Sequence, residues 1–174
     1  MIEIKNVSYS YENAVTDGAL KNVSLCIPQG QTVLLCGESG SGKTTLLSVL
    51  AGCVDYTGDV TVGGEAPKGR TLRNVRRRLG VLFENPDDQF LFPTVREDVG
   101  YALRGLPHEE MERRVDMLLA DLGLPTANRP IASLSRGQRQ RVALAGVLAA
   151  EPDLLLLDEP TAALDEAEKR RLVD

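Results

Sequence analysis

The sequence lacks tryptophan, has a single histidine and three cysteines, and contains no long hydrophobic run. The cysteines, Cys26, Cys36 and Cys53, form no Cys-x-x-Cys pair and are odd in number. We therefore expect reduced, buried thiols in a cytosolic protein rather than a disulfide framework or a zinc site. The longest apolar run, 142–150, is too short to span a bilayer, so any membrane contact must be provided by a partner.

An excess of positive charge is also missing. The 20 Lys and Arg residues are outnumbered by 25 Asp and Glu residues, and the net charge of −5 gives no support for nucleic acid as a partner. Six positive charges gather in 68–78, but no aromatic residue lies among them to stack on bases. We favour a solvated face for this segment. The length of 174 residues, without repeats or low-complexity linkers, predicts a single domain over 1–174.

The most informative stretch follows an apolar, strand-like run at 32–36 and precedes a helix-like run at 46–51. Its spacing, Gly-x-x-x-x-Gly-Lys-Thr, is the complete P-loop pattern in the strand–turn–helix context that a P-loop requires. Glycines let successive backbone N–H groups point at phosphate oxygens, and the following helix adds its positive end. Lys43 can reach the β- and γ-phosphates, and the Thr44 hydroxyl can ligate Mg²⁺. The predicted triphosphate site consists of Gly37, Glu38, Ser39, Gly40, Ser41, Gly42, Lys43, Thr44 and Thr45.

Two tyrosines, Tyr9 and Tyr11, lie upstream of this loop. Packing within a strand accounts for them as well as a functional role does. The alternative is that one ring stacks on the nucleotide base, and for that role we favour Tyr11.

A second candidate site follows the four leucines at 154–157, which predict a fully buried strand. Asp158 and Glu159 come directly after it, at the strand end where ligands bind in parallel sheets. Two adjacent acids there are costly to explain as packing. Asp158 can hold Mg²⁺ through water, and Glu159 can polarise a water in line with the γ-phosphate.

The remaining chain predicts short strands around Ile2–Val7, 25–27 and 60–62, and we expect them to form a small antiparallel sheet beside a parallel core. A buried strand is expected at 79–83. Helical patterns follow, one with an apolar face from Met111 to Leu122, and a further helix opens at Ser135, a good N-cap. A serine, a glycine and a helix N-terminus also make an anion site there.

Taken together, these motifs resemble those of the ATP-binding cassette (ABC) family. Gly37–Thr44 is similar to its Walker A motif, 134–138 to its signature motif, 154–159 to its Walker B strand and 163–165 to its D-loop. Within the family, 83–90 and 93–99 look most like the ATPase subunits of energy-coupling-factor importers, which import vitamins and transition-metal ions. The resemblance implies an α/β P-loop NTPase core with a small antiparallel β subdomain and an inserted α-helical subdomain over roughly 86–150.

The resemblance also implies a mechanism. Two cassettes, identical or paralogous, form a head-to-tail dimer with ATP between them, and Ser135, Gly137 and Gln138 of one face the ATP of the other. Lys43 and Glu159 would be catalytic, and Mg²⁺ would be held by Thr44, Glu84 and Asp158. Such a subunit hydrolyses ATP in the cytoplasm, at the inner face of the membrane, bound to an integral-membrane transporter subunit and to no nucleic acid.

Three departures from the family pattern bear on catalysis. Glu84 stands where the family has Gln, and Arg136 stands where the signature has Gly. The family's switch histidine, expected downstream of the Walker B strand, has no counterpart, because His108 lies upstream of that strand. We expect a shortened cassette. The alternatives are a regulatory or degenerate subunit with little catalysis and a non-transport ABC ATPase.

Overall fold

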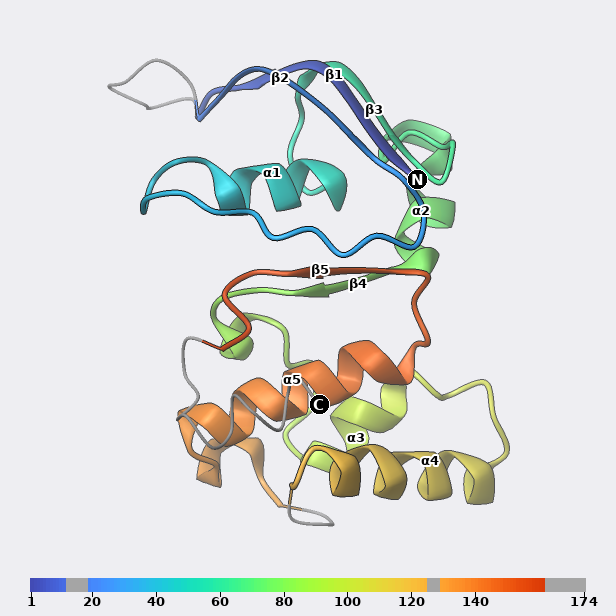
Figure 1. Ribbon diagram of the computed structural model, residues 1–174. Coiled ribbons are helices and arrows are strands. Elements are labelled where there is room, and N and C mark those ends of the chain that lie inside the picture. The colour runs from blue at the N-terminus through green and yellow to red at the C-terminus, as the bar shows by residue number, and fades with distance from the viewer. Residues whose placement is uncertain (12–18, 125–128, 162–174) are drawn as a thin grey trace. The chain divides into compact units, whose positions relative to one another are not determined.

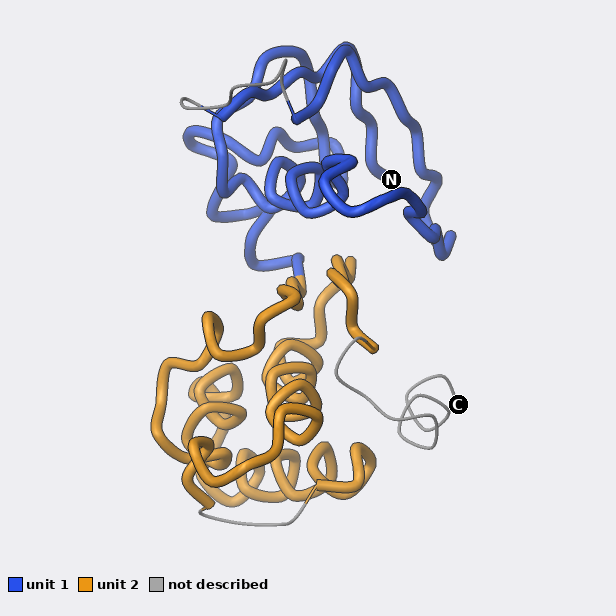
Figure 2. The backbone as a smooth tube through the Cα atoms, turned by 90° about the vertical axis from the view of Figure 1, so that its left-hand side faces the viewer, with its two compact units in different colours: residues 1–79 blue, residues 80–174 orange. Residues whose placement is uncertain are grey.

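The computed structural model describes residues 1–11, 19–124 and 129–161. The chain divides into two compact units, unit 1 over 1–79 and unit 2 over 80–174 (Figure 2). Each unit has its own sheet and its own helices, and each carries a different part of the residues that the sequence singled out.

Unit 1 contains a three-stranded antiparallel sheet of β1 (Ile2–Tyr9), β2 (Leu20–Ile27) and β3 (Thr57–Val62), in the order β2-β1-β3. Ile2 of β1 lies opposite Ile27 of β2 and Val62 of β3. Ile2 and Ile4 are buried in the alternation expected of a strand with one face in the core, and Val7 is buried beyond a register shift that lies between Ile4 and Val7. The predicted small antiparallel sheet is therefore confirmed.

Helix α1 (Lys43–Leu50) lies along one face of this sheet (Figure 1) and buries Leu46, Val49 and Leu50. A 3₁₀ turn, η1 (Gly69–Thr71), and helix α2 (Leu72–Arg78) follow β3. Arg76 of α2 donates hydrogen bonds to the carbonyls of Ala51 and Gly52 at the end of α1. The basic segment 68–78 is thus more than a solvated face, because this arginine satisfies carbonyls that have no partner within α1.

The strand predicted at 32–36 is not formed, and this expectation was wrong. Val33, Leu34 and Leu35 are 50%, 85% and 40% exposed, and the segment belongs to no sheet. An extended segment becomes a strand only when a neighbour accepts and donates its backbone hydrogen bonds. No described segment of unit 1 pairs with this one.

The prediction of buried cysteines was also wrong, since Cys26, Cys36 and Cys53 are all free and exposed. Cys26 lies on β2, an outer strand of the sheet with mostly exposed side chains. Cys36 ends the unpaired segment 32–36, and Cys53 lies in the turn after α1. Apolar residues near Cys26 and Cys36, namely Leu25, Leu34 and Leu35, are exposed as well, so the composition of these segments misled the prediction.

Unit 2 contains the strand pair β4 (Leu79–Leu82) and β5 (Leu154–Leu157), with helices α3 (Val95–Tyr101), α4 (His108–Asp121) and α5 (Arg136–Ala149). The turns η2 (Pro86–Asp88) and η3 (Ile131–Ser133) complete it. The strands β4 and β5 are parallel, and helix α5 lies between this strand pair and helices α3 and α4 (Figure 1). The helices predicted from the face of 111–122 and from Ser135 are confirmed.

The core of unit 2 has two parts that meet on α5. One is formed between the helices by side chains such as Val99, Val115, Leu119 and Val142. The other joins α5 to β4 through Leu82, Ala143 and Leu144. Adjacent side chains of α5 thus face opposite layers, and this explains why the run 142–150 is apolar without being a membrane span.

The strand β5 is not fully buried, contrary to the prediction from its four leucines. Leu156 is 5% exposed, whereas Leu155 and Leu157 are 39% and 38% exposed. Successive side chains of a strand point to opposite faces. In unit 2 helix α5 covers only one of those faces.

The loop between β4 and α3 is held by side chains at both ends. Gln89 accepts a hydrogen bond from the amide of Phe83 (2.9 Å) and donates one to the carbonyl of Val81 (2.8 Å). Asp98 of α3 accepts hydrogen bonds from the amides of Leu91 and Phe92, and burial raises the pKa of its carboxyl above the usual value. The loop that contains Glu84 is therefore fastened to the strand it leaves and to the helix it enters.

Candidate nucleotide-binding site

The glycine-rich loop of unit 1 turns directly into α1. Gly40 and Gly42 have φ angles of 81° and 92°, a conformation that glycine adopts without steric cost. The amide of Leu46 donates to the carbonyl of Gly42 (2.8 Å), which is the first hydrogen bond of the helix. The amides of residues 43–45 precede that bond and have no acceptor within α1. They form the positive end of a helix directly after the loop, as the P-loop pattern predicts.

Gly42 is required by its surroundings as well as by its backbone angle. A Cβ atom at this position would lie 2.5 Å from the carbonyl oxygen of Ala19 and 3.1 Å from the side chain of Leu20. The loop therefore rests on the beginning of β2, and only glycine permits this approach.

Lys43 curls back over its own loop. Its Nζ atom donates hydrogen bonds to the carbonyls of Gly37 and Glu38, both at 2.9 Å. The ammonium group is thus held at the loop by two neutral acceptors rather than by a carboxylate. A phosphate oxygen would be a stronger partner, because hydrogen bonds between two charged groups are stronger than those to a carbonyl.

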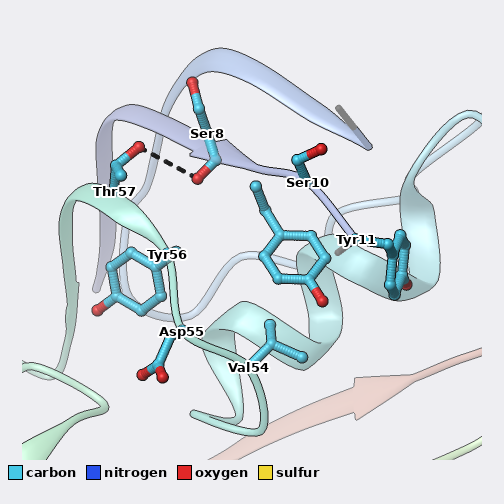
Figure 3. A pocket seen from close by; sticks show the side chains of 8 residues that line it. Ser8, Ser10, Tyr11, Val54, Asp55, Tyr56 and Thr57 are labelled. Carbon is cyan, nitrogen blue, oxygen red and sulfur yellow. Dashed lines mark hydrogen bonds between the residues drawn. The ribbon is translucent and has the colours of Figure 1, made fainter. Parts of the chain in front are cut away.

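Tyr11 lies beside the first turn of α1. Its hydroxyl is 3.1 Å from Oγ1 of Thr45, and its ring packs edge-to-face on Tyr9 with the centroids 4.9 Å apart. The Tyr11 side chain is 53% exposed. A pocket of about 810 Å³, lined by residues 8–11 and 54–57, opens next to it (Figure 3). The favoured candidate for base stacking therefore lies next to the helix that carries the phosphate loop.

Unit 2 carries the predicted carboxylates at the ends of its two paired strands. Asp158 follows β5 and is 4% exposed, and its amide donates to the carbonyl of Leu82 in β4 (2.8 Å). Its Oδ2 atom is buried and has no hydrogen-bond partner among the described residues. Glu159 is exposed and has a φ angle of 47°, and Glu84 is exposed just beyond β4. A buried carboxylate oxygen without a donor is costly, and a cation is the partner that best offsets this cost.

Helix α5 begins with a complete capping box. The Ser135 hydroxyl accepts from the amide of Gln138 (3.2 Å), and the Gln138 side chain accepts from the amide of Ser135 (3.0 Å). Both side chains are used by the helix itself, so the first-turn amides, including that of Gly137, are the groups left for an anion. Arg139 pairs with Asp87 of η2 (3.4 Å), which joins this turn to the loop after β4.

The structure also contains site contacts that the sequence analysis missed. The Tyr11–Thr45 contact joins residues 34 positions apart, and the role of Gln89 depends on a strand edge, so neither has a local signal. The ion pair of Arg139 with Asp87 was missed for the same reason. The predicted D-loop, 163–165, lies outside the described residues.

Two other features are absent from the described part of the chain. No group of three or more His, Cys, Asp and Glu side chains there could hold a metal ion. Among these residues, no helix has both the length and the apolar character needed to cross a membrane.

Comparisons with known proteins agree on the family. Residues 20–162 match the family model described as ABC transporter. The chain is 42% identical to a putative ABC transporter ATP-binding protein of Streptomyces coelicolor, over 99% of this chain and 67% of that protein. It is also 42% identical to the energy-coupling factor transporter ATP-binding protein EcfA1 of Enterococcus faecalis, over 95% of this chain and 61% of the relative. The chain thus spans roughly two thirds or less of the length of these relatives.

Solved structures give the same result. A dimeric ATP-binding cassette in a post-hydrolysis state with ADP and Pi matches with a TM-score of 0.89 and 33% identity, covering 99% of this chain and 79% of that one. CbiO1 from Clostridium perfringens, part of an ABC transporter complex, matches with a TM-score of 0.80 and 32% identity, covering 98% of this chain and 70% of CbiO1. The family and the α/β cassette fold predicted from the motifs are confirmed, and the chain belongs to the ABC transporter family as an ATP-binding cassette domain.

Proposed function

We propose that this chain binds Mg-ATP and hydrolyses it as the nucleotide-binding subunit of an ABC importer of the energy-coupling-factor type. The observation that carries the proposal is the glycine-rich loop, in which Lys43 and the first amides of α1 form a cluster of donors around one turn of backbone. Such a cluster of donors matches the oxygens of a triphosphate.

In this proposal the two units have different tasks. Unit 1 holds the phosphates with residues 37–45 and the base with Tyr11. The Mg²⁺ ligands that we propose are Thr44, Glu84 and Asp158, and Glu159 is proposed to orient the attacking water. Oxygen ligands suit Mg²⁺, and the unpartnered Oδ2 of Asp158 supports this assignment. The metal, when bound, would neutralise charge on the phosphates.

The importer role and the partners are supported by the relatives. EcfA1 proteins are named as transporter ATP-binding proteins, and CbiO1 as part of a transporter complex. A matching cassette is dimeric. We propose that this chain likewise pairs with a second cassette, identical or paralogous, in which Ser135, Gly137 and Gln138 face the partner's ATP. The pair would work at the cytoplasmic face of a membrane subunit that carries a vitamin or a metal ion.

The proposal is tested with Lys43→Ala. Removing a charged donor to phosphate should weaken Mg-ATP binding by on the order of a hundredfold in calorimetry. Lys68→Ala is the matched control, because Lys68 is also in unit 1 but lies over the Tyr56 ring. Equal affinity of Lys43→Ala and wild type would refute the nucleotide site. ATP binding without any turnover, in the presence of the membrane partner, would favour the regulatory alternative.

A further inference from the structure

The ring of Tyr11 is fixed by side chains from two different elements. Tyr11 itself lies beyond the end of β1 and belongs to no helix or strand. Its hydroxyl contacts Thr45 on α1 at 3.1 Å, and its ring packs at 85° against Tyr9 in the last position of β1. Regular backbone structure does not set the place of this ring, so the two contacts must do so.

The two adjacent threonines at the start of α1 are in different surroundings. Thr44 is exposed, whereas Thr45 is only 5% exposed. Neighbouring side chains on a helix point about 100° apart, so these two hydroxyls lie in different directions from the helix axis. Ser48 of the same helix donates to the carbonyl four residues earlier, as such hydroxyls commonly do. The Thr45 hydroxyl instead meets the phenol of Tyr11.

We infer that Thr45 and Tyr9 are positioning residues that fix the Tyr11 ring relative to the phosphate loop. The side chain of Thr45 then acts on the nucleobase through Tyr11, while its backbone amide remains in the loop. A base stacked on Tyr11 and phosphates held by α1 would belong to one nucleotide, whose two ends are kept in register by this contact. The inference rests on the proposed function, specifically on the stacking role of Tyr11.

The test compares Mg-ATP with Mg-tripolyphosphate, which has phosphates but no base, by calorimetry on the whole chain. Tyr11→Ala should weaken ATP binding by about tenfold or more, because the stacking platform is lost. Thr45→Val should weaken ATP binding about fivefold, the equivalent of one net hydrogen bond. Tyr11→Ala should not alter tripolyphosphate binding, Thr45→Val should weaken it less than it weakens ATP binding, and Thr45→Ser should restore ATP affinity.

A double-mutant cycle isolates the contact itself. Tyr11→Phe keeps the ring and removes the hydroxyl, so it should match Thr45→Val, and the double variant should be no weaker than either single one. Tyr9→Leu should weaken ATP binding about threefold through loss of the ring contact. Thr71→Val is the control, because it removes a threonine hydroxyl that bonds the carbonyls of Ala66 and Lys68 elsewhere in unit 1.

Two results would overturn the inference. Equal weakening of ATP and tripolyphosphate by Thr45→Val would show that this side chain serves the phosphates or the fold of the loop. Additive effects of Tyr11→Phe and Thr45→Val would show that the contact carries no coupling. In both cases the proposed function would stand if the wild-type chain binds ATP and the Lys43→Ala variant does not. A wild-type chain that binds neither ligand would refute both.

Discussion

In unit 1 the candidate site is made mainly of backbone, whereas in unit 2 it is made of side chains at the ends of strands. The loop of unit 1 presents amides and a lysine that already has two carbonyl acceptors. The candidate site of unit 2 instead contains the buried Oδ2 atom of Asp158, which has no hydrogen-bond partner among the described residues. One site has its donors in place, and the other has a carboxylate oxygen whose cost of burial is not offset by a described residue.

This difference determines which substitutions should impair each site. A backbone site depends on a few positions where the chain must take an unusual angle or approach closely, and most side-chain changes leave it intact. A side-chain site depends on individual functional groups and on the packing that holds the strand ends. Changes in the two units should therefore have effects of different kind and size.

The largest effect is expected for the acid that follows β5. Glu159→Gln keeps the shape of the side chain but removes the base, so ATP turnover should fall by about 10²–10⁴-fold while ATP binding persists. Glu151→Gln is a close control, since Glu151 is also an exposed glutamate of unit 2 with a positive φ angle (48°). Phosphate release and calorimetry measure the two properties. Undiminished turnover in Glu159→Gln would assign the base to another residue.

A core change in unit 2 tests whether the sites are separate in stability. Leu119 is fully buried between the helices, and Leu119→Ala should cost about 2–5 kcal/mol of unfolding free energy. Leu91→Ala, at a leucine that is 69% exposed in the same unit, should cost little. Thermal unfolding measures both. If Leu119→Ala also weakens tripolyphosphate binding at temperatures below its melting temperature, the site of unit 1 and the core of unit 2 are not independent in stability.

The backbone character of the unit 1 site is tested at Gly42. Gly42→Ala adds a strained φ angle and a Cβ atom 2.5 Å from a carbonyl oxygen, which together should cost about 2–4 kcal/mol and distort the loop. Gly64 has a similar φ angle (86°), but no heavy atom lies within 4 Å of a Cβ atom added there, so Gly64→Ala should cost about 1–2 kcal/mol of unfolding free energy. Thermal unfolding measures the cost in stability, and tripolyphosphate binding measures the distortion of the loop. Equal costs would mean that the loop does not rest on β2.

The smallest effect is expected on the surface of α4. Glu110 accepts hydrogen bonds from Arg113 (2.8 and 2.9 Å) and Arg114 (2.9 Å), which lower its pKa from 4.5 to about 2. A lowered carboxyl pKa contributes stability that is present above the unfolded value and is lost as the pH falls toward 2.

Thermal unfolding between about pH 5 and about pH 3 should therefore show a slightly steeper loss of stability for wild type than for Glu110→Gln. The effect is small because the pair is exposed to solvent. Glu109→Gln removes the same charge one residue earlier and serves as the control. A loss of equal slope in wild type and Glu110→Gln would mean that these hydrogen bonds do not persist in solution.

The sequence predicted well those features that local chemistry determines. The helix that follows the glycine-rich turn and the cap at Ser135 were predicted correctly because each motif lies within a few residues. The strand expected at 32–36 and the full burial of 154–157 were wrong, because pairing and burial depend on what lies beside a strand. The contact of Tyr11 with Thr45 could not be predicted, since it joins distant segments through two ordinary hydroxyls.

The side chain of Gln89 has a consequence for how the sheet of unit 2 can grow. The carbonyl of Leu82 points to β5, so the carbonyl of Val81 and the amide of Phe83 point to the opposite edge of β4. Gln89 occupies both groups with its own amide, as a one-residue substitute for a neighbouring strand. That edge is closed to edge-to-edge aggregation at this point. An additional strand therefore finds these two groups of β4 already paired, which favours its addition on the side of β5.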